Sequence, residues 1–257
     1  MIPKTQAQGV LMSSAAPAAA HLDGYRGTWQ DKAVLCAVYG DYYRRMVKQL
    51  NRGPTLELGA GSGQLREHLQ DVVLTDIQPA TWLDAAADAQ ALPFSAGYFE
   101  NIVMLDVLHH IENPSQFFAE AARALKPGGR LVMLEPAITP LSGLFYRYLH
   151  PEPVDMSQDP FASPTANPER GPYDANQAVP TLLFRRHRAK FEHHFPDFRL
   201  HAVRYLSLFA YPLSGGYRRW SLLPASLVRP LLFVEDGLLT LLGPAMAFRL
   251  FVLLERR

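Results

Sequence analysis

The sequence contains a single cysteine, Cys36, in 257 residues, which excludes an internal disulfide and a cysteine-rich metal site. Charged residues are also few, at 19%, and they leave a formal net charge of only +1. With 48% hydrophobic residues, this composition excludes a disordered chain and a coiled coil. The chain is therefore apolar enough to bury a large core, and its one cysteine fits a reducing cytoplasm.

Long uninterrupted hydrophobic runs are missing as well. The best candidate for a membrane span, 238–254, is broken by Pro244 and Arg249. Near the start, the apolar core at 10–12 is too short for a signal peptide. We therefore expect a disordered leader over residues 1–20 and a cytoplasmic protein, with peripheral contact to the inner face of the membrane as an open alternative.

The small net charge conceals an asymmetry along the chain. Residues 1–180 hold 13 Lys and Arg against 19 Asp and Glu, whereas residues 181–257 hold 12 against 5. The basic part is interleaved with Leu, Val and Phe, and it contains no recognised RNA-binding module. This combination suits an apolar partner with an anionic head group, or a membrane surface, better than nucleic acid.

Short apolar runs that predict strands alternate with segments that predict helices. Helices are expected over 30–51, 62–70, 114–125 and 180–195. Strands are expected at 55–58, 72–76, weakly within 82–89, and at 101–107, 130–135, 198–209 and 248–256. This alternation predicts an α/β, doubly wound and mostly parallel sheet. Ligands bind at the carboxyl ends of such strands. The carboxylates expected there are Glu57, Asp76, Asp88, Asp106 and Glu135.

The stretch "TLELGAGSGQL" (55–65) predicts a loop in which backbone approaches a ligand. Its three glycines alternate, Gln64 stands where a dinucleotide loop has its third glycine, and no Gly-Lys-Ser/Thr follows. Glu57 precedes the loop, and a carboxylate there would repel a pyrophosphate but suit an ammonium group. The pattern therefore predicts a nucleoside that carries an amino acid, not a nucleotide.

Five elements in order across residues 55–136 resemble class I S-adenosylmethionine-dependent methyltransferases of the small-molecule, methyltransferase type 11-like kind. They are "LELGAGSG", Asp76 at the end of the second strand, Asp88-Ala89 followed by "LPF", "FENIVMLDVLHHIENP" and "ALKPGGRLVMLEP". The resemblance implies a Rossmann-like methyltransferase fold with a seven-stranded sheet and helical cap insertions. It also implies S-adenosyl-L-methionine as the cofactor.

The resemblance further implies which residues bind the cofactor. The loop glycines would admit the methionine part, and Glu57 would favour its ammonium. Asp76 would accept both ribose hydroxyls, since a carboxylate has two acceptor oxygens. Asp88 would accept from the adenine amino group, unless it caps a helix. Tyr25 would fold over the cofactor, unless it is only a packed aromatic. The full set of expected contacts is Tyr25, Glu57, Gly59, Ala60, Gly61, Gly63, Asp76, Ile77, Asp88, Ala89, Leu105 and Asp106.

Three residues are candidates for the chemistry. His109 and His110 follow the fourth strand, where a neutral imidazole could deprotonate a hydroxyl acceptor, and His110 is the preferred base. Glu135 ends the fifth strand and faces the same crevice. The alternative is that both histidines cap the next helix or contact the cofactor. Acidic residues after 150 show no metal-ligand spacing, so no metal is expected.

The chain is thus expected to have a cofactor-binding half, 21–136, and a C-terminal half, 137–257. Insertions at 137–179 and 210–247 would emerge over the site and form a substrate cap, the second as two short helices separated near Gly237. The expected function is methyl transfer to an oxygen of a small apolar or lipid-like acceptor. The alternatives are C-methylation of a quinone or aromatic ring, an RNA methyltransferase, and a non-catalytic cofactor-binding protein.

Overall fold

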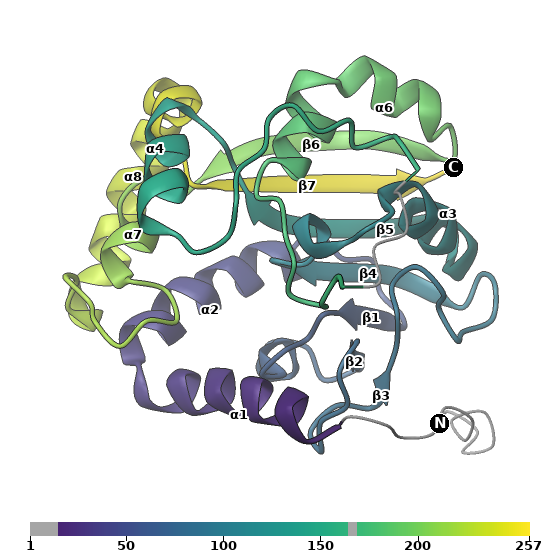
Figure 1. The fold of residues 1–257 in the computed structure, drawn as a ribbon, viewed down its shortest axis with the longest axis horizontal. Helices are drawn as coiled ribbons and strands as arrows, with labels where there is room; N and C mark the ends of the chain where they lie inside the picture. Colours follow the sequence, from purple (N-terminus) through teal and green to yellow (C-terminus); the bar gives the residue numbers. More distant parts are fainter. Residues whose placement is uncertain (1–14, 164–168) are drawn as a thin grey trace.

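A seven-stranded sheet in the order β3-β2-β1-β4-β5-β7-β6 forms the centre of the computed structural model, which describes residues 15–163 and 169–257 (Figure 1). Its strands are β1 (Thr55–Leu58), β2 (Val72–Asp76), β3 (Ala85–Ala86), β4 (Phe99–Leu105), β5 (Leu125–Pro136), β6 (Phe198–Leu206) and β7 (Arg249–Arg256). Only β7 runs antiparallel, to both β5 and β6. The predicted fold class is confirmed.

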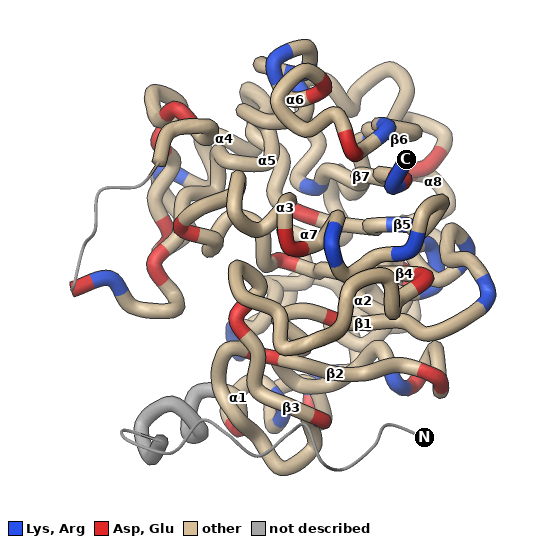
Figure 2. The backbone as a smooth tube through the Cα atoms, turned by 90° about the vertical axis from the view of Figure 1, so that its right-hand side faces the viewer, with Lys and Arg blue, Asp and Glu red and all other residues tan. Residues whose placement is uncertain are grey.

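Helices cover both faces of this sheet. They are α1 (Ala15–Asp31), α2 (Ala33–Val47), α3 (Pro114–Ala124), α4 (Pro140–Leu149), α5 (Val179–Thr181), α6 (Arg188–His194), α7 (Ala210–Ser214) and α8 (Ala225–Met246), with the short turns η1 (Gln64–Glu67), η2 (Leu108–His110) and η3 (Leu182–Arg186). No helix among the described residues is long and apolar enough to cross a membrane. Basic and acidic positions are interspersed over the side of the molecule drawn in Figure 2.

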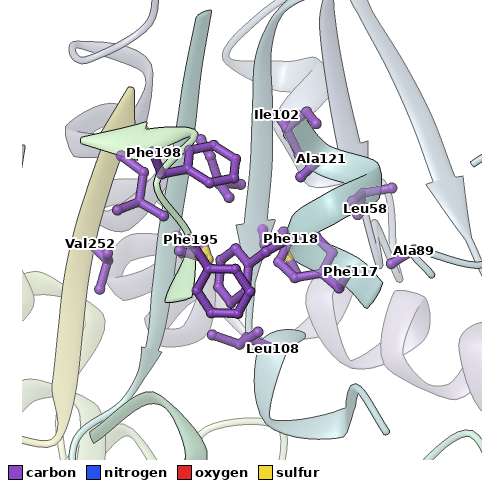
Figure 3. Packing of buried hydrophobic residues seen from close by; sticks show 14 of the residues in the cluster. Leu58, Ala89, Ile102, Leu108, Phe117, Phe118, Ala121, Phe195, Phe198 and Val252 are labelled. Carbon is purple, nitrogen blue, oxygen red and sulfur yellow. The ribbon is translucent and has the colours of Figure 1, made fainter. Parts of the chain in front are cut away.

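The alternation of side chains along β4 divides the core into two halves. Ile102 and Met104 pack with α3, η3 and α6, whereas Val103 packs with α2, α7 and α8. In the first half the ring centre of Phe118 lies 5.2 Å from that of Phe191 and 4.7 Å from that of Phe195. Figure 3 labels Phe118 and Phe195 among the residues of this half. The central strand is buried on both faces, as expected for a parallel sheet between two helical layers.

Two predicted helical segments differ from the structure, and one helix was not predicted. The helix over 62–70 is wrong, because Gly63 is left-handed (φ 81°) and only the four-residue turn η1 follows. The helix over 30–51 is confirmed as α2, whereas α1 was not predicted and begins at Ala15 inside the predicted leader; residues 1–14 lie outside the described part. Segment 210–247 contains α7 and one continuous α8 rather than two helices broken near Gly237, because α8 buries Val228, Leu232 and Glu235 along one side.

The two insertions come together at one end of the sheet. Helix α4 follows β5, α7 follows β6, and α8 leads into β7, so all three lie at the carboxyl ends of the parallel strands (Figure 1). Helix α8 contacts α2, α4 and β6. This places the helical segments beside the end of the sheet where ligands bind.

Candidate active site

A cavity of about 1140 Å³ opens at the carboxyl ends of β1, β2 and β4. It is bounded by the glycine loop, by α1 and α2, and by residues of both insertions. The predicted site residues that line it are Tyr25, Gly59, Ala60, Gly61, Asp76, Ile77, Asp88, Ala89, Leu105, Asp106, His109 and His110. Three predicted site residues do not line it, namely Glu57, Gly63 and Glu135.

The three glycines of the loop differ in what lies next to each of them. All three have positive φ angles, which only glycine adopts without strain. A Cβ at Gly59 would lie 2.4 Å from Val107 Cγ2, so this glycine allows β1 to approach the end of β4. A Cβ at Gly61 would have only Gly59 O near it, at 4.0 Å, so Gly61 faces open space in the cavity. Gly63 instead lies against Trp82, which explains its absence from the cavity wall.

Asp76, the last residue of β2, is held rigidly at the cavity wall. Its Oδ2 accepts from Gly61 N at 3.0 Å and its Oδ1 from Gln78 N at 3.1 Å. Burial raises the pKa of this carboxyl, and the backbone N–H groups oppose the rise. Each oxygen keeps a second lone pair, so the carboxylate can still accept from a pair of ligand hydroxyls.

Two other predicted cofactor contacts have different surroundings. Glu57 lies fully buried near Tyr43, and its Oε2 has no hydrogen-bond partner. Burial raises its pKa well above the ordinary value. Because Glu57 does not line the cavity, an effect on a ligand ammonium would have to be indirect. Asp88 lines the cavity and accepts from Gln90 N at 2.8 Å in a turn; no described helix begins there, so it is not a helix cap.

His109 is held between two carboxylates. Glu135, at the end of β5, accepts from the backbone N–H groups of Val107 (2.9 Å) and Leu108 (2.8 Å), and its Oε2 lies 2.8 Å from His109 Nδ1. On the other side, Glu152 Oε2 lies 3.3 Å from His109 Nε2. Burial alone would lower the pKa of His109, but the bonds to both carboxylates outweigh it and raise the pKa to about 10. His109 is therefore an imidazolium at neutral pH and cannot accept a proton.

His110 is in the opposite protonation state. Its ring centre lies 4.2 Å from that of His109, and burial together with the His109 charge lowers its pKa to about 4. Its Nδ1 is buried without a partner, and its Nε2 lies 4.0 Å from Glu152 Oε1, which is too far for a hydrogen bond. His110 is therefore a neutral imidazole on the cavity wall. His109, His110 and Glu152 also bring ligand atoms within 4.8 Å of one another, but hydrogen bonds already occupy both His109 nitrogens.

The second insertion contributes an aromatic wall. Tyr217 lies 4.9 Å from Tyr25 and 5.5 Å from Tyr39, measured between ring centres. Lys32, between α1 and α2, anchors this loop: its Nζ donates to the carbonyls of Gly216 and Arg218, both at 2.6 Å, and of Trp220 at 2.9 Å. The N-terminal helices and the cap therefore close one side of the cavity together.

Comparison with known proteins identifies the core of the chain. Residues 56–133 match the family model of a methyltransferase domain. Over these residues, about a third of the chain, the protein is similar to methyltransferase domains. A solved S-adenosylmethionine-dependent methyltransferase from Archaeoglobus fulgidus aligns with a TM-score of 0.51 over 86% of this chain and 93% of its own, at 13% identity, which supports the fold.

Two curated proteins are similar to part of this chain. The demethylmenaquinone methyltransferase of Tropheryma whipplei is 37% identical over 91 residues, or 33% of this chain and 37% of the relative. The ubiquinone/menaquinone biosynthesis C-methyltransferase of Ruegeria sp. is 33% identical over 106 residues, which are 41% of this chain and 42% of the relative. The chain thus spans less than half the length of either relative.

Sequence reasoning missed several residues of the candidate site. Glu152 was one of the acidic residues after 150 and had no feature that set it apart. Its partner His109 is distant in the sequence, so the sequence did not indicate their contact. Arg249 is fully buried on the cavity wall and pairs with Asp106. Its signal was an arginine at the head of the otherwise apolar strand "RLFVLLER". Tyr39 and Tyr217 of the wall gave no distinguishing pattern in the sequence, whereas Tyr25 was predicted.

Proposed function

We propose that this enzyme transfers the methyl group of S-adenosylmethionine to a hydroxyl oxygen of a small acceptor with an apolar, aromatic body. A single observation carries the proposal: one cavity joins the glycine loop and Asp76 to the neutral imidazole of His110 and the aromatic cap. Its volume of about 1140 Å³ leaves room for a nucleoside cofactor and an acceptor together.

The residues of the first half of the cavity fit the cofactor. Gly61 opens toward the space where a side chain would obstruct a ligand, and the fixed Asp76 carboxylate suits a ribose diol. Asp88 and Ala89, beyond β3, line the part of the cavity expected to hold adenine. When bound, S-adenosylmethionine supplies an electrophilic methyl group, so the protein has to orient the acceptor and remove its proton.

The other half of the cavity fits an apolar acceptor. Phe145, Tyr211 and Trp220 line it from the two insertions. Of the two adjacent histidines, His110 is the one that can take a proton there, since His109 is already protonated. The low pKa of His110 keeps it unprotonated at neutral pH and makes it a weak base, so it would accept the proton during transfer rather than before it.

A ring carbon is the second candidate for the methylated atom. The named activities of the curated relatives support it, because those from Tropheryma whipplei and Ruegeria sp. are methyltransferases of quinone biosynthesis. On a phenol-like ring, methylation of either the oxygen or the adjacent carbon ends with loss of one proton, so the same imidazole serves both.

Labelled-methyl transfer tests the proposal. The full chain would be incubated with methyl-labelled S-adenosylmethionine and separate pools of phenols, quinols, lipids and RNA. We expect label in an organic-soluble small molecule, and less label with the Asp76→Ala variant when S-adenosylmethionine is limiting. Mass spectrometric fragmentation then separates a methoxy from a ring methyl product. Label that is found only in RNA would overturn the proposal.

A further inference from the structure

The outer side of the cap is apolar although it faces solvent. Phe233 is 83% exposed and Leu241 78%, values that are unusual for large apolar side chains. We call this surface the α4/α8 face. Its exposed apolar members are Leu141, Leu144, Tyr148, Leu149, Trp220, Leu222, Leu227, Phe233, Val234 and Leu241. An apolar surface of this extent indicates a binding partner.

The face follows from the geometry of two adjacent helices. Leu227, Val234 and Leu241 recur every seven residues along α8 and so lie along one side of it, opposite the buried side chains of Val228 and Leu232. Helix α4 contacts α8 and exposes its own apolar row, which includes Leu144 and Tyr148. Helix α8 is therefore apolar on both sides, yet only one side is covered by protein.

The charges around the face have one sign. Residues 140–149 and 210–234 contain four arginines and no Asp or Glu. Arg147, Arg219 and Arg229 are exposed, and Arg229 lies one helical turn before Phe233. Asp236, just beyond, is paired with Arg45 at 2.8 Å. On the side of the molecule drawn in Figure 2, by contrast, basic and acidic positions are interspersed.

We propose that the α4/α8 face docks on the surface of an anionic lipid bilayer, with α8 lying in the plane of the interface. Apolar side chains flanked by arginines match such a surface, where acyl chains lie beneath negative head groups. A second copy of the chain fits less well, because a symmetric contact would bring the arginines of both copies together.

The cavity wall is continuous with this face. Phe145 of α4 and Trp220 and Arg218 of the loop before α8 line the cavity, and Trp220 is also partly exposed on the face. An apolar acceptor dissolved in the bilayer would thus enter without crossing water. The route rests on the proposed function, whereas docking itself does not require methyl transfer.

Vesicle binding of the full chain tests the proposal. Sedimentation would compare vesicles of phosphatidylcholine alone with vesicles containing a quarter phosphatidylglycerol. We expect binding to the anionic vesicles, weaker binding at high salt, and a blue shift of Trp220 fluorescence. Phe233→Ser with Leu241→Ser should weaken binding on the order of tenfold, and Arg219→Gln with Arg229→Gln by roughly fivefold per arginine.

Matched controls come from the opposite end of the sheet. Tyr98, just before β4, is exposed and apolar, and Arg199, near the start of β6, is exposed and basic. Tyr98→Ser and Arg199→Gln should leave vesicle binding unchanged. The proposal is overturned if the parent fails to bind anionic vesicles, or if the control variants lose as much binding as the face variants. Concentration-dependent dimers that are abolished by Phe233→Ser would assign the face to a second copy instead.

Discussion

Arg249 and Asp106, 143 residues apart in the sequence, form an ion pair on the wall of the cavity. Arg249 Nη2 donates to Asp106 Oδ2 at 3.0 Å, and Nη1 pairs with Oδ1. The guanidinium lies 3.9 Å from the ring centre of Tyr211, while Asp106 has a left-handed backbone (φ 59°). The first residue of β7 thus fixes the residue that follows β4, in a conformation that is uncommon for aspartate.

Removing this arginine should destabilise the fold. Arg249→Met leaves the Asp106 carboxylate without its partner, and breaking a buried pair costs on the order of 3 kcal/mol in the free energy of unfolding. Chemical denaturation measures the loss. The double variant Arg249→Met, Asp106→Asn should recover part of it, because no unpaired charge remains. If Arg249→Met is as stable as the parent, the pair does not stabilise the fold.

Substitutions at Asp76 and at Gly61 should weaken cofactor binding to different extents. Asp76→Ala should weaken binding by about 1–3 kcal/mol, since the ribose hydroxyls lose a charged acceptor. Gly61→Val should abolish it, because a side chain would enter the cavity and the backbone has φ 50° there. Calorimetry on folded variants checks both. Unchanged affinity in both variants would place the cofactor elsewhere.

Stability should fall at alkaline pH because of His109. Its pKa is raised to about 10 in the folded state against 6.5 ordinarily, so the stabilisation is complete below about pH 6.5 and is lost as the pH rises toward 10. Denaturation at pH 6 and pH 9.5 measures the difference. In the His109→Gln variant, the free energy of unfolding should differ less between pH 6 and pH 9.5. A difference as large as that of the parent would contradict the raised pKa of His109.

His110 should show its role in turnover and in the pH profile. If it accepts the proton, His110→Ala should lower kcat by about 10²–10⁴-fold with little change in cofactor affinity. Its pKa of about 4 predicts a kcat/KM that is level from pH 6 to 8 and falls only in more acidic solution, as the imidazole becomes protonated. An inflection near pH 6.5 that disappears in His110→Ala would show an ordinary histidine instead.

Local patterns were enough to predict the sheet and the glycine loop. The strand β4 is a short run of branched apolar residues, and Asn113-Pro114 starts α3 with the Asn113 side chain accepting from Gln116 N. Both signals involve neighbours in sequence. Asp76 could be placed because it ends a strand next to the loop.

The coupled charges could not be predicted in the same way. Arg249 meets Asp106, and Glu152 meets His109, only after the insertions fold back over the sheet. The sequence does not show that the two ring nitrogens of His109 each lie beside a carboxylate. Both histidines were therefore candidates for the base. Helix α8 was mispredicted for a related reason: Gly237 suggests a break, but burial of one side of the helix keeps it continuous.

Titration calorimetry with S-adenosylhomocysteine and with NAD tests the central claim most directly. The cavity has Gly61 open to a ligand and a fixed Asp76, and Gln64 stands where a dinucleotide loop has its third glycine. We therefore predict binding of S-adenosylhomocysteine with a Kd in the roughly micromolar range and no binding of NAD. Binding of NAD without binding of S-adenosylhomocysteine would contradict the account.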